Sequence, residues 1–255
     1  MLPFIIFSLP RTGSTTLVRL VNCHPGIHCI FEPFNPTNRA QYSIRADNLR
    51  RLHGLTVAVQ QLWTVCNGIK HVWSWDGFPF KDDPELNRQM LTGMGARMIF
   101  LTRKNSLRRA ISAQISAQMQ LWTPNTPEDF RHIREHQFRE LDIDALREDV
   151  EKSRAAEEWA RDELKLSGLP WREWHYEEFF EPTTSEDTRV ERVQSILEFL
   201  EVGRVTDAGR IAEMHRLLDP AATGFQNAAA YEKIPNIQDV ERELGSDSTG
   251  HVFVP

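Results

Sequence analysis

A short loop rich in hydroxyl side chains follows the first apolar segment and carries the clearest chemical signal in the sequence. It reads Pro10-Arg11-Thr12-Gly13-Ser14-Thr15-Thr16 and leads into an amphipathic stretch. Where a strand turns into a helix, several backbone N–H groups lack partners and point at one spot, with the positive end of the helix dipole behind them. Gly13 would let the backbone approach an anion closely, and Arg11 adds a cation. The loop therefore predicts a phosphate-binding site.

The loop differs from the one that binds nucleoside triphosphates, GxxxxGK[ST]. Ser8 stands where the first Gly of that pattern belongs, and Ser14 stands where its Lys belongs. The side chain that would clamp a triphosphate is therefore missing. A tight turn with an ordinary helix cap is the alternative to an anion site.

Three more reactive side chains follow later apolar segments. Glu32 comes after the segment 27–31, and Lys70 and His71 lie near the end of the segment 68–73. Ligands of open α/β sheets bind at the carboxyl ends of the strands, so these residues are expected near the loop. Lys70 and His71 are adjacent, so in an extended strand they point to opposite faces, and we favour Lys70 as the one that faces the ligand.

Short apolar runs alternate with longer amphipathic stretches, which is the pattern of a sheet built from βαβ units. The expected strands are 4–7, 27–31, 68–73, 97–102 and 174–176. The clearest expected helices are 105–120, 140–166 and 189–200. We predict an α/β, three-layer, P-loop-like fold with a central, mainly parallel sheet of about five strands flanked by helices. One domain over residues 1–255 is expected, with 219–255 as an irregular C-terminal tail that packs over the domain.

The composition excludes several classes of protein. With 40% apolar and 26% charged residues and a net charge of −6, the chain is typical of a folded protein and not of a nucleic-acid scaffold. Cys23, Cys29 and Cys66 form an odd count without CxxC spacing, which predicts free buried thiols in a reducing compartment. No apolar run approaches the ~20 residues of a membrane span, so a cytoplasmic location is expected.

Two segments together resemble the sulfotransferases that use 3′-phosphoadenosine 5′-phosphosulfate (PAPS). The loop matches all six positions of the family pattern P-[RK]-[ST]-G-[ST]-[ST], which holds the 5′-phosphosulfate. The family binds the 3′-phosphate through an Arg at a strand's end and a Ser two turns into the next helix, which implies Arg103 and Ser112 here. Their spacing of nine residues is that of the bacterial carbohydrate and nodulation-factor branch. The cytosolic animal branch uses eight, which would make Lys104 the counterpart.

Two further segments extend the resemblance. The stretch 174–182, with 196–200 after it, is similar to the family's "YEDL…P…ILEFLG" segment, which implies that Tyr176 lies against the adenine. A core tyrosine on an edge strand is the alternative. The stretch 231–236 resembles the tail that closes over the nucleotide, which implies a role for Lys233. The nucleotide-binding set is then Arg11, Thr12, Gly13, Ser14, Thr15, Thr16, Arg103, Ser112, Tyr176 and Lys233.

The resemblance implies transfer of a sulfuryl group from PAPS to a hydroxyl of a carbohydrate, glycolipid or small-molecule acceptor, with no metal. Glu32, in an "EP" turn as in the carbohydrate branch, is the expected general base, with His71 as the rival base and Arg11 and Lys70 as catalytic cations. A capping or salt-bridged carboxylate is the alternative for Glu32. A P-loop kinase-like phosphotransferase and a non-catalytic nucleotide-binding module are the alternative functions. No nucleic-acid partner is expected, and an oligomer is compatible with the sequence.

Overall fold

The computed structural model describes residues 2–45, 49, 52–81, 83–124, 126–181, 184–219 and 231–253. A five-stranded sheet lies at its centre, in the order β2-β3-β1-β4-β5, and every neighbouring pair of strands is parallel. The strands are β1 (Phe4–Ser8), β2 (Cys29–Phe31), β3 (Gly68–Val72), β4 (Arg97–Thr102) and β5 (Trp171–His175). The predicted α/β class with a parallel sheet is confirmed.

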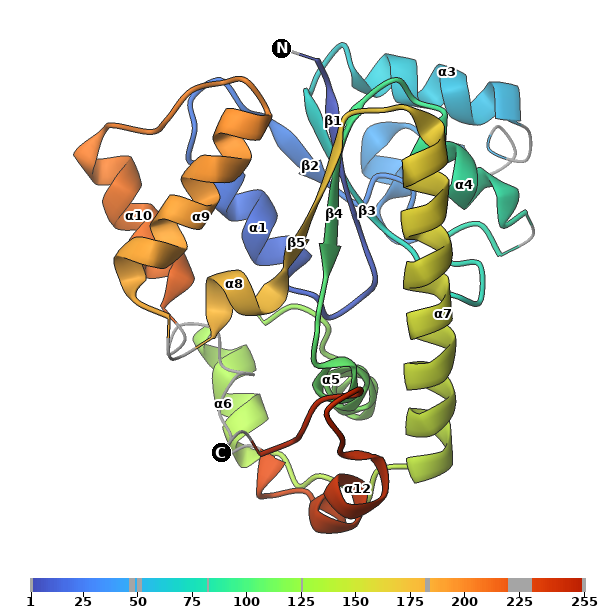
Figure 1. Ribbon diagram of the computed structural model, residues 1–255, viewed down its shortest axis with the longest axis vertical. Helices are drawn as coiled ribbons and strands as arrows, with labels where there is room; N and C mark the ends of the chain where they lie inside the picture. The colour runs from blue at the N-terminus through green and yellow to red at the C-terminus, as the bar shows by residue number, and fades with distance from the viewer. Residues whose placement is uncertain are drawn as a thin grey trace.

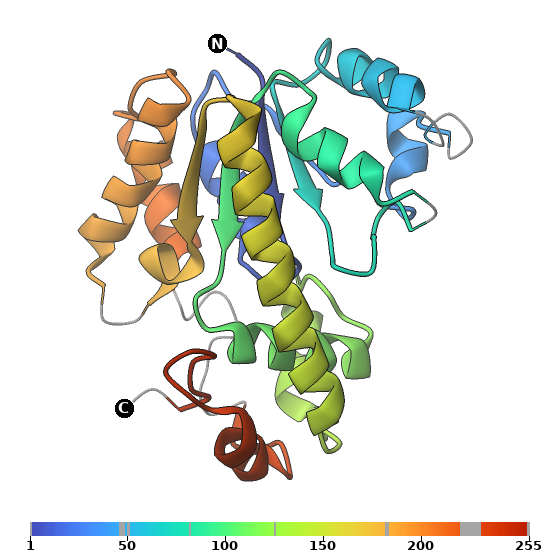
Figure 2. The same ribbon diagram turned by 45° about the vertical axis from the view of Figure 1, so that its right-hand side comes forward.

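Helices cover both faces of the sheet, which gives three layers (Figures 1 and 2). One face carries α1 (Ser14–Val21), α9 (Glu186–Phe199) and α10 (Ala208–Leu218). The other carries α3 (Leu52–Leu62), α4 (Glu85–Thr92) and the long α7 (Ile143–Ser167). Beyond the carboxyl ends of the strands lie α5 (Ser106–Met119), α6 (Pro127–Glu135) and α12 (Ile237–Leu244). The short helices η1 (Arg39–Tyr42) and α8 (Tyr176–Phe180) complete the described elements.

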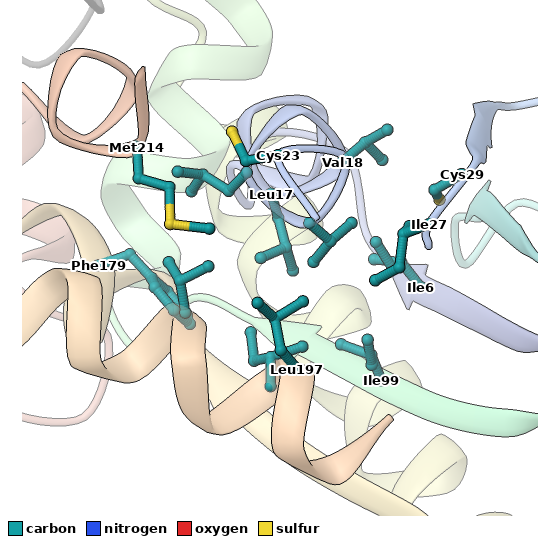
Figure 3. Close-up of a cluster of buried hydrophobic side chains, with 14 of the residues drawn as sticks. Ile6, Leu17, Val18, Cys23, Ile27, Cys29, Ile99, Phe179, Leu197 and Met214 are labelled. Carbon is teal, nitrogen blue, oxygen red and sulfur yellow. The ribbon is translucent and has the colours of Figure 1, made fainter. Parts of the chain in front are cut away.

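Strand alternation divides the core between the two faces. On β1, Phe4 and Ile6 pack toward α1 and α9, whereas Ile5 and Phe7 pack toward α3, α4 and α7. Figure 3 shows the first of these clusters, in which side chains of the sheet meet Leu17 of α1 and Leu197 of α9. The unbroken apolar run of β1 is thus explained, because a strand covered on both faces needs apolar residues at every position.

The fifth strand lies earlier than the sequence predicted. It ends at His175, and Tyr176 is the first residue of α8 and not part of a strand. The Glu178 carboxylate accepts a hydrogen bond from the His175 N–H at 3.0 Å. Acidic side chains in a first turn favour a helix start, which explains why the backbone leaves the strand here.

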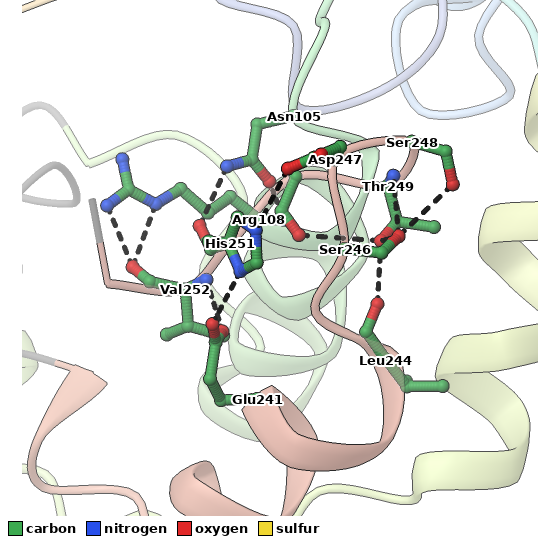
Figure 4. Close-up of polar contacts among 11 residues, drawn as sticks. Asn105, Arg108, Glu241, Leu244, Ser246, Asp247, Ser248, Thr249, His251 and Val252 are labelled. Carbon is green, nitrogen blue, oxygen red and sulfur yellow. Dashed lines mark hydrogen bonds and ion pairs between the residues drawn. The ribbon is translucent and has the colours of Figure 1, made fainter. Parts of the chain in front are cut away.

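The C-terminal region is more regular than the irregular tail that was predicted. Ile237 and Val240 lie three residues apart and are buried, so α12 forms around one apolar stripe. The following turn packs against the start of α5: Ser106 Oγ donates to the Thr249 carbonyl at 3.1 Å, and Arg108 donates to the Val252 carbonyl (Figure 4). Residues 220–230 of the predicted tail lie outside the described residues.

Two expectations from composition can be compared with the described residues. All three cysteines are free and buried, as predicted. In the described part of the chain, no helix combines the length and the apolar character needed to cross a bilayer.

Candidate functional site

The phosphate-loop candidate joins β1 to α1. Gly13 caps α1 in the left-handed conformation, with φ of 80°, and Arg11 before it also has a positive φ of 69°. The first backbone bond of α1 runs from the Leu17 N–H to the Gly13 carbonyl at 3.0 Å. The N–H groups from Ser14 to Thr16 precede that bond and therefore have no acceptor within the helix. The loop thus presents the N-terminus of a helix at the carboxyl edge of the sheet, where an anion is stabilised.

Gly13 also leaves room for a neighbouring aromatic side chain. A Cβ at this position would lie 2.8 Å from Cε2 of Phe180 and 2.9 Å from Cδ2 of Tyr176. The ring of Tyr176 therefore packs directly on the loop, and burial raises the pKa of its hydroxyl to about 12. Glycine is required here both by the backbone conformation and by this close approach.

The Arg11 side chain leaves the loop and reaches α5. Its Nε donates to Ser112 Oγ at 2.9 Å, and its Nη1 donates to the Trp122 carbonyl. Burial and the neighbouring charge of Arg103 lower the pKa of Arg11 to about 10. The sequence predicted that the Arg11 guanidinium lies beside the N-terminus of α1. In the structure this guanidinium contacts Ser112 of α5 instead.

Arg103 joins Arg11 at the same place. Its Nη1 donates to the Arg11 carbonyl at 3.3 Å, and its guanidinium lies over the Tyr176 ring, 4.2 Å from the centroid. Its Nε is buried and has no hydrogen-bond partner among the described residues. Two arginines held this close repel each other, so the arrangement favours an anion that both can bind.

Lys104, the alternative to Arg103, differs from it in exposure. Its side chain is exposed, and its backbone N–H donates to the Glu177 carboxylate at 3.0 Å. The structure therefore brings Arg103 and Ser112 together beside the loop and leaves Lys104 outside this group.

Glu32 and Lys70 form an ion pair on the other side of α1's first turn. Lys70 Nζ lies 2.7 Å from Glu32 Oε1 and donates to Thr15 Oγ1, also at 2.7 Å. The pairing of β1 with β3 sets Lys70 beside Ile6, so its side chain faces α1. Lys70 thereby links the carboxylate to the loop, and it is the cation nearest to Thr15 in the described site.

The electrostatics of the pair favour an ionised carboxylate. Burial alone raises the pKa of Glu32, but the Lys70 charge and the hydrogen bonds from Lys70 and Asn35 lower it below its ordinary value. Burial lowers the pKa of the Lys70 ammonium, and Glu32 opposes that shift. Glu32 has a positive φ of 41°, and a non-glycine residue held in this region is strained. A charged carboxylate with 21% of its side chain exposed can accept a proton from a ligand.

His71 is a core residue, and its place as rival base is corrected by the structure. It is 1% exposed and belongs to the opposite face of the sheet, where its ring stacks on Phe7 and Phe80. Its Nε2 lies 2.9 Å from Asn87 Oδ1. Burial lowers the pKa of His71 to about 4, so the ring stays neutral. The alternation that aims Lys70 at α1 aims His71 away from it.

Lys233 is not part of the site, which corrects its assignment to the nucleotide. Its exposed ammonium donates to the Arg134 carbonyl at 2.9 Å, at the end of α6. Tyr231 is buried in the cluster around α5, and it lies close enough to Arg11 to oppose part of the lowering of the Arg11 pKa by burial and Arg103. The described tail therefore approaches the site through Tyr231, which the sequence analysis did not single out.

The remaining loop residues divide by role. Thr12 is buried, and its hydroxyl donates to the Leu9 carbonyl at 2.9 Å, so only its backbone is available to a ligand. Ser14 is buried and Thr16 half-buried at the start of α1.

Asn35, which the sequence analysis missed, donates to Glu32 Oε2 at 2.8 Å. In the described part of the chain, no group of three or more His, Cys, Asp or Glu side chains is arranged to hold a metal ion.

Comparisons with known proteins add a structural likeness. No family model matches the chain, and no curated protein matches it. Among solved structures, the chain is similar to the mouse sulfotransferase SULT7A1 complexed with PAP, with 13% sequence identity and a TM-score of 0.45. The match covers 86% of this chain and 65% of that protein, so the chain spans a little under two thirds of its length.

Proposed function

We propose that this chain is a PAPS-dependent sulfotransferase that acts on a hydroxyl of a carbohydrate, glycolipid or small-molecule acceptor. One observation carries the proposal. The N-terminus of α1 opens at the sheet edge between the Arg11–Arg103–Ser112 cluster on one side and the Glu32–Lys70 pair on the other. Two candidate anion-binding sites and an ionised carboxylate therefore lie around the first turn of α1.

The two anion sites differ in kind, and this supports a nucleotide with phosphates at both ends of its ribose. The first turn of α1 offers backbone N–H groups and hydroxyls, with the Lys70 ammonium at Thr15. The second offers the guanidinium of Arg103 and the hydroxyl of Ser112. The first would hold the 5′-phosphosulfate and the second the 3′-phosphate. Tyr176, which packs on Gly13 and carries the Arg103 guanidinium over its ring, stands between them, where the base would lie against it.

The chemistry needed at such a site is a displacement at sulfur. The acceptor oxygen forms a new bond to sulfur, the bond from sulfur to the bridging phosphate oxygen breaks, and the hydroxyl proton passes to the Glu32 carboxylate. Negative charge then develops on the released 5′-phosphate, where the α1 amides and Lys70 stabilise it. Positioning and electrostatics dominate, as they do in phosphoryl transfer.

Two features separate this proposal from the alternatives. A kinase-like loop would carry Lys at position 14, and this chain has a buried Ser there. Binding of a nucleotide without catalysis does not require an ionised carboxylate beside the loop. Glu32 is nevertheless kept charged by Lys70.

Sulfuryl transfer is tested directly by product formation. With PAPS and a panel of mono- and oligosaccharides, glycolipids and small alcohols, we expect 3′,5′-adenosine bisphosphate (PAP) to form with at least one acceptor. Formation should continue in excess chelator, because no step proposed here uses a metal. The readout is chromatography of PAP together with a mass increase of one sulfuryl group on the acceptor. Formation of ADP from ATP·Mg²⁺, with no PAP from PAPS, would support the kinase alternative instead.

A further inference from the structure

The turn after β2 holds Asn35 in one orientation. Its side-chain Nδ2 donates to Glu32 Oε2 at 2.8 Å. Its Oδ1 accepts from the Thr37 N–H at 3.1 Å and from the Thr37 hydroxyl at 2.8 Å. Because two donors fix the carbonyl end of the amide, the NH₂ end must face Glu32. An isolated amide could flip, but this one is set by Thr37.

Both oxygens of the Glu32 carboxylate are therefore fixed. Lys70 holds Oε1 at 2.7 Å and Asn35 holds Oε2 at 2.8 Å. The backbone of the turn is tied as well, because the Asn35 N–H donates to the Glu32 carbonyl at 3.0 Å. Each carboxylate oxygen has two lone pairs, so one on each oxygen is left for a proton-donating ligand.

We propose that Asn35 is a positioning residue: its amide aims the Glu32 carboxylate and holds it in the charged form that accepts the acceptor's proton. The inference rests on the proposed function, in which Glu32 is the base. An amide suits this task because it donates a hydrogen bond to the carboxylate without adding charge. A carboxylate at the same position would repel Glu32 and compete with it for protons.

The charged and titratable groups around Glu32 are few among the described residues. Lys70 from β3 is the principal one, and His71 on the same strand, whose pKa burial lowers to about 4, acts more weakly on Glu32. Arg11 from the loop acts on Lys70. None of these groups changes in the variants used below, so a shift in Glu32 titration reports on position 35.

The decisive variant is Asn35→Asp. It is nearly isosteric, and its carboxylate still accepts both bonds from Thr37, so the turn is kept while the donor to Glu32 is replaced by a like charge. Two carboxylates at this distance share a proton, which raises the apparent pKa of the pair. We expect the Glu32 titration midpoint, followed by NMR of ¹³Cδ-labelled glutamate and assigned with Glu32→Gln, to rise by about one pH unit or more.

Asn38→Asp is the matched control. It adds the same charge three residues further on. There the Asn38 Nδ2 donates to the Glu32 backbone carbonyl at 3.4 Å and not to the carboxylate, and its Oδ1 lies 3.3 Å from the Thr37 hydroxyl, an acceptor that aspartate keeps. We expect a much smaller shift there. Equal shifts in the two variants would overturn the proposal, because the effect would then be long-range charge alone. Asn35→Ala should also raise the midpoint, and an unchanged midpoint would overturn the proposal too.

The NMR titration needs neither acceptor nor turnover, so it separates this inference from the function on which it rests. If Glu32→Gln keeps full sulfuryl transfer, the proposed role of Glu32 fails whatever Asn35 does. If Glu32→Gln is inactive but Asn35→Asp leaves the Glu32 titration and the acid limb of the pH–rate profile in place, only the positioning role of Asn35 fails.

Discussion

Glu32→Gln is expected to lower kcat about 10²- to 10⁴-fold, the range for loss of a general base. The substitution keeps the shape of the side chain, and its amide oxygen can still accept from Lys70, which lies 2.7 Å from Glu32 Oε1. What it removes is basicity. Because Lys70 stays hydrogen-bonded at Thr15 and Glu32 itself holds no phosphate in the proposed site, the Kd for PAP should not rise. Steady-state kinetics and calorimetry on the same preparation check both halves of the expectation.

The pH dependence of the wild type gives an independent view of the same residue. The pKa of Glu32 is lowered by Lys70 and Asn35 against the effect of burial, so the base stays charged to a lower pH than an ordinary glutamate. Activity should therefore be lost only as the pH falls through this lowered value. Glu85→Gln, at an exposed position of α4, is the control and should behave as wild type. A Glu32→Gln enzyme with wild-type kcat would remove Glu32 as the base.

Arg103→Ala is expected to weaken binding of PAP about 10- to 150-fold, the effect of losing one charge-assisted contact of roughly 1.5–3 kcal/mol. Binding of adenosine 5′-monophosphate, which lacks the 3′-phosphate, should change far less. The reason is that Arg103 lies with Arg11 and Ser112, whereas the proposed 5′-phosphate site is formed by the first turn of α1 and by Lys70, which donates to Thr15. Calorimetric Kd values for the two nucleotides give the ratio directly.

Lys104→Ala is the matched control for that experiment, because it removes a cation from the adjacent position. Lys104 is exposed, and solvent screens its charge more than that of Arg103, so its loss should leave the ratio of the two Kd values near that of the wild type. If Lys104→Ala changes the ratio and Arg103→Ala does not, the 3′-phosphate site has been placed on the wrong residue.

Local patterns were sufficient to predict the sheet and the loop. β1 is apolar from Phe4 to Phe7, ends at Ser8 and is followed by Pro10 and Gly13, so strand, turn and helix start could all be predicted from a few residues. Strand alternation was likewise sufficient to separate Lys70 from His71, because the two faces of β3 differ in what covers them.

Contacts between distant segments could not be predicted in the same way. Arg11 and Ser112 are 101 residues apart, and the path of the Arg11 side chain depends on where α5 lies relative to the loop. Lys233 has a charge suited to a nucleotide, yet the fold directs it to the end of α6. Tyr176 occupies a helix start because of Glu178, a local signal that was present but not used.

The role proposed for Asn35 could not be predicted from the sequence, for a different reason. Nothing in its type or spacing marks it, since asparagine is common in turns for local reasons. Its relation to Glu32 emerges only when the side chains of Glu32, Asn35 and Thr37 are placed together. A residue that orients a reactive group through one hydrogen bond has no sequence signature of its own.

Thermal unfolding with PAP or with ATP·Mg²⁺ distinguishes a loop that binds a 3′-phosphorylated adenosine nucleotide, as proposed here, from one that binds a nucleoside triphosphate. A ligand at 100 times its Kd adds about 2.7 kcal/mol to the free energy of unfolding. For a chain of this size, that corresponds to a rise in Tm of roughly 5–10 °C. We predict such a rise with PAP and little or none with ATP·Mg²⁺ at the same concentration. A larger rise with ATP·Mg²⁺ than with PAP would contradict the account.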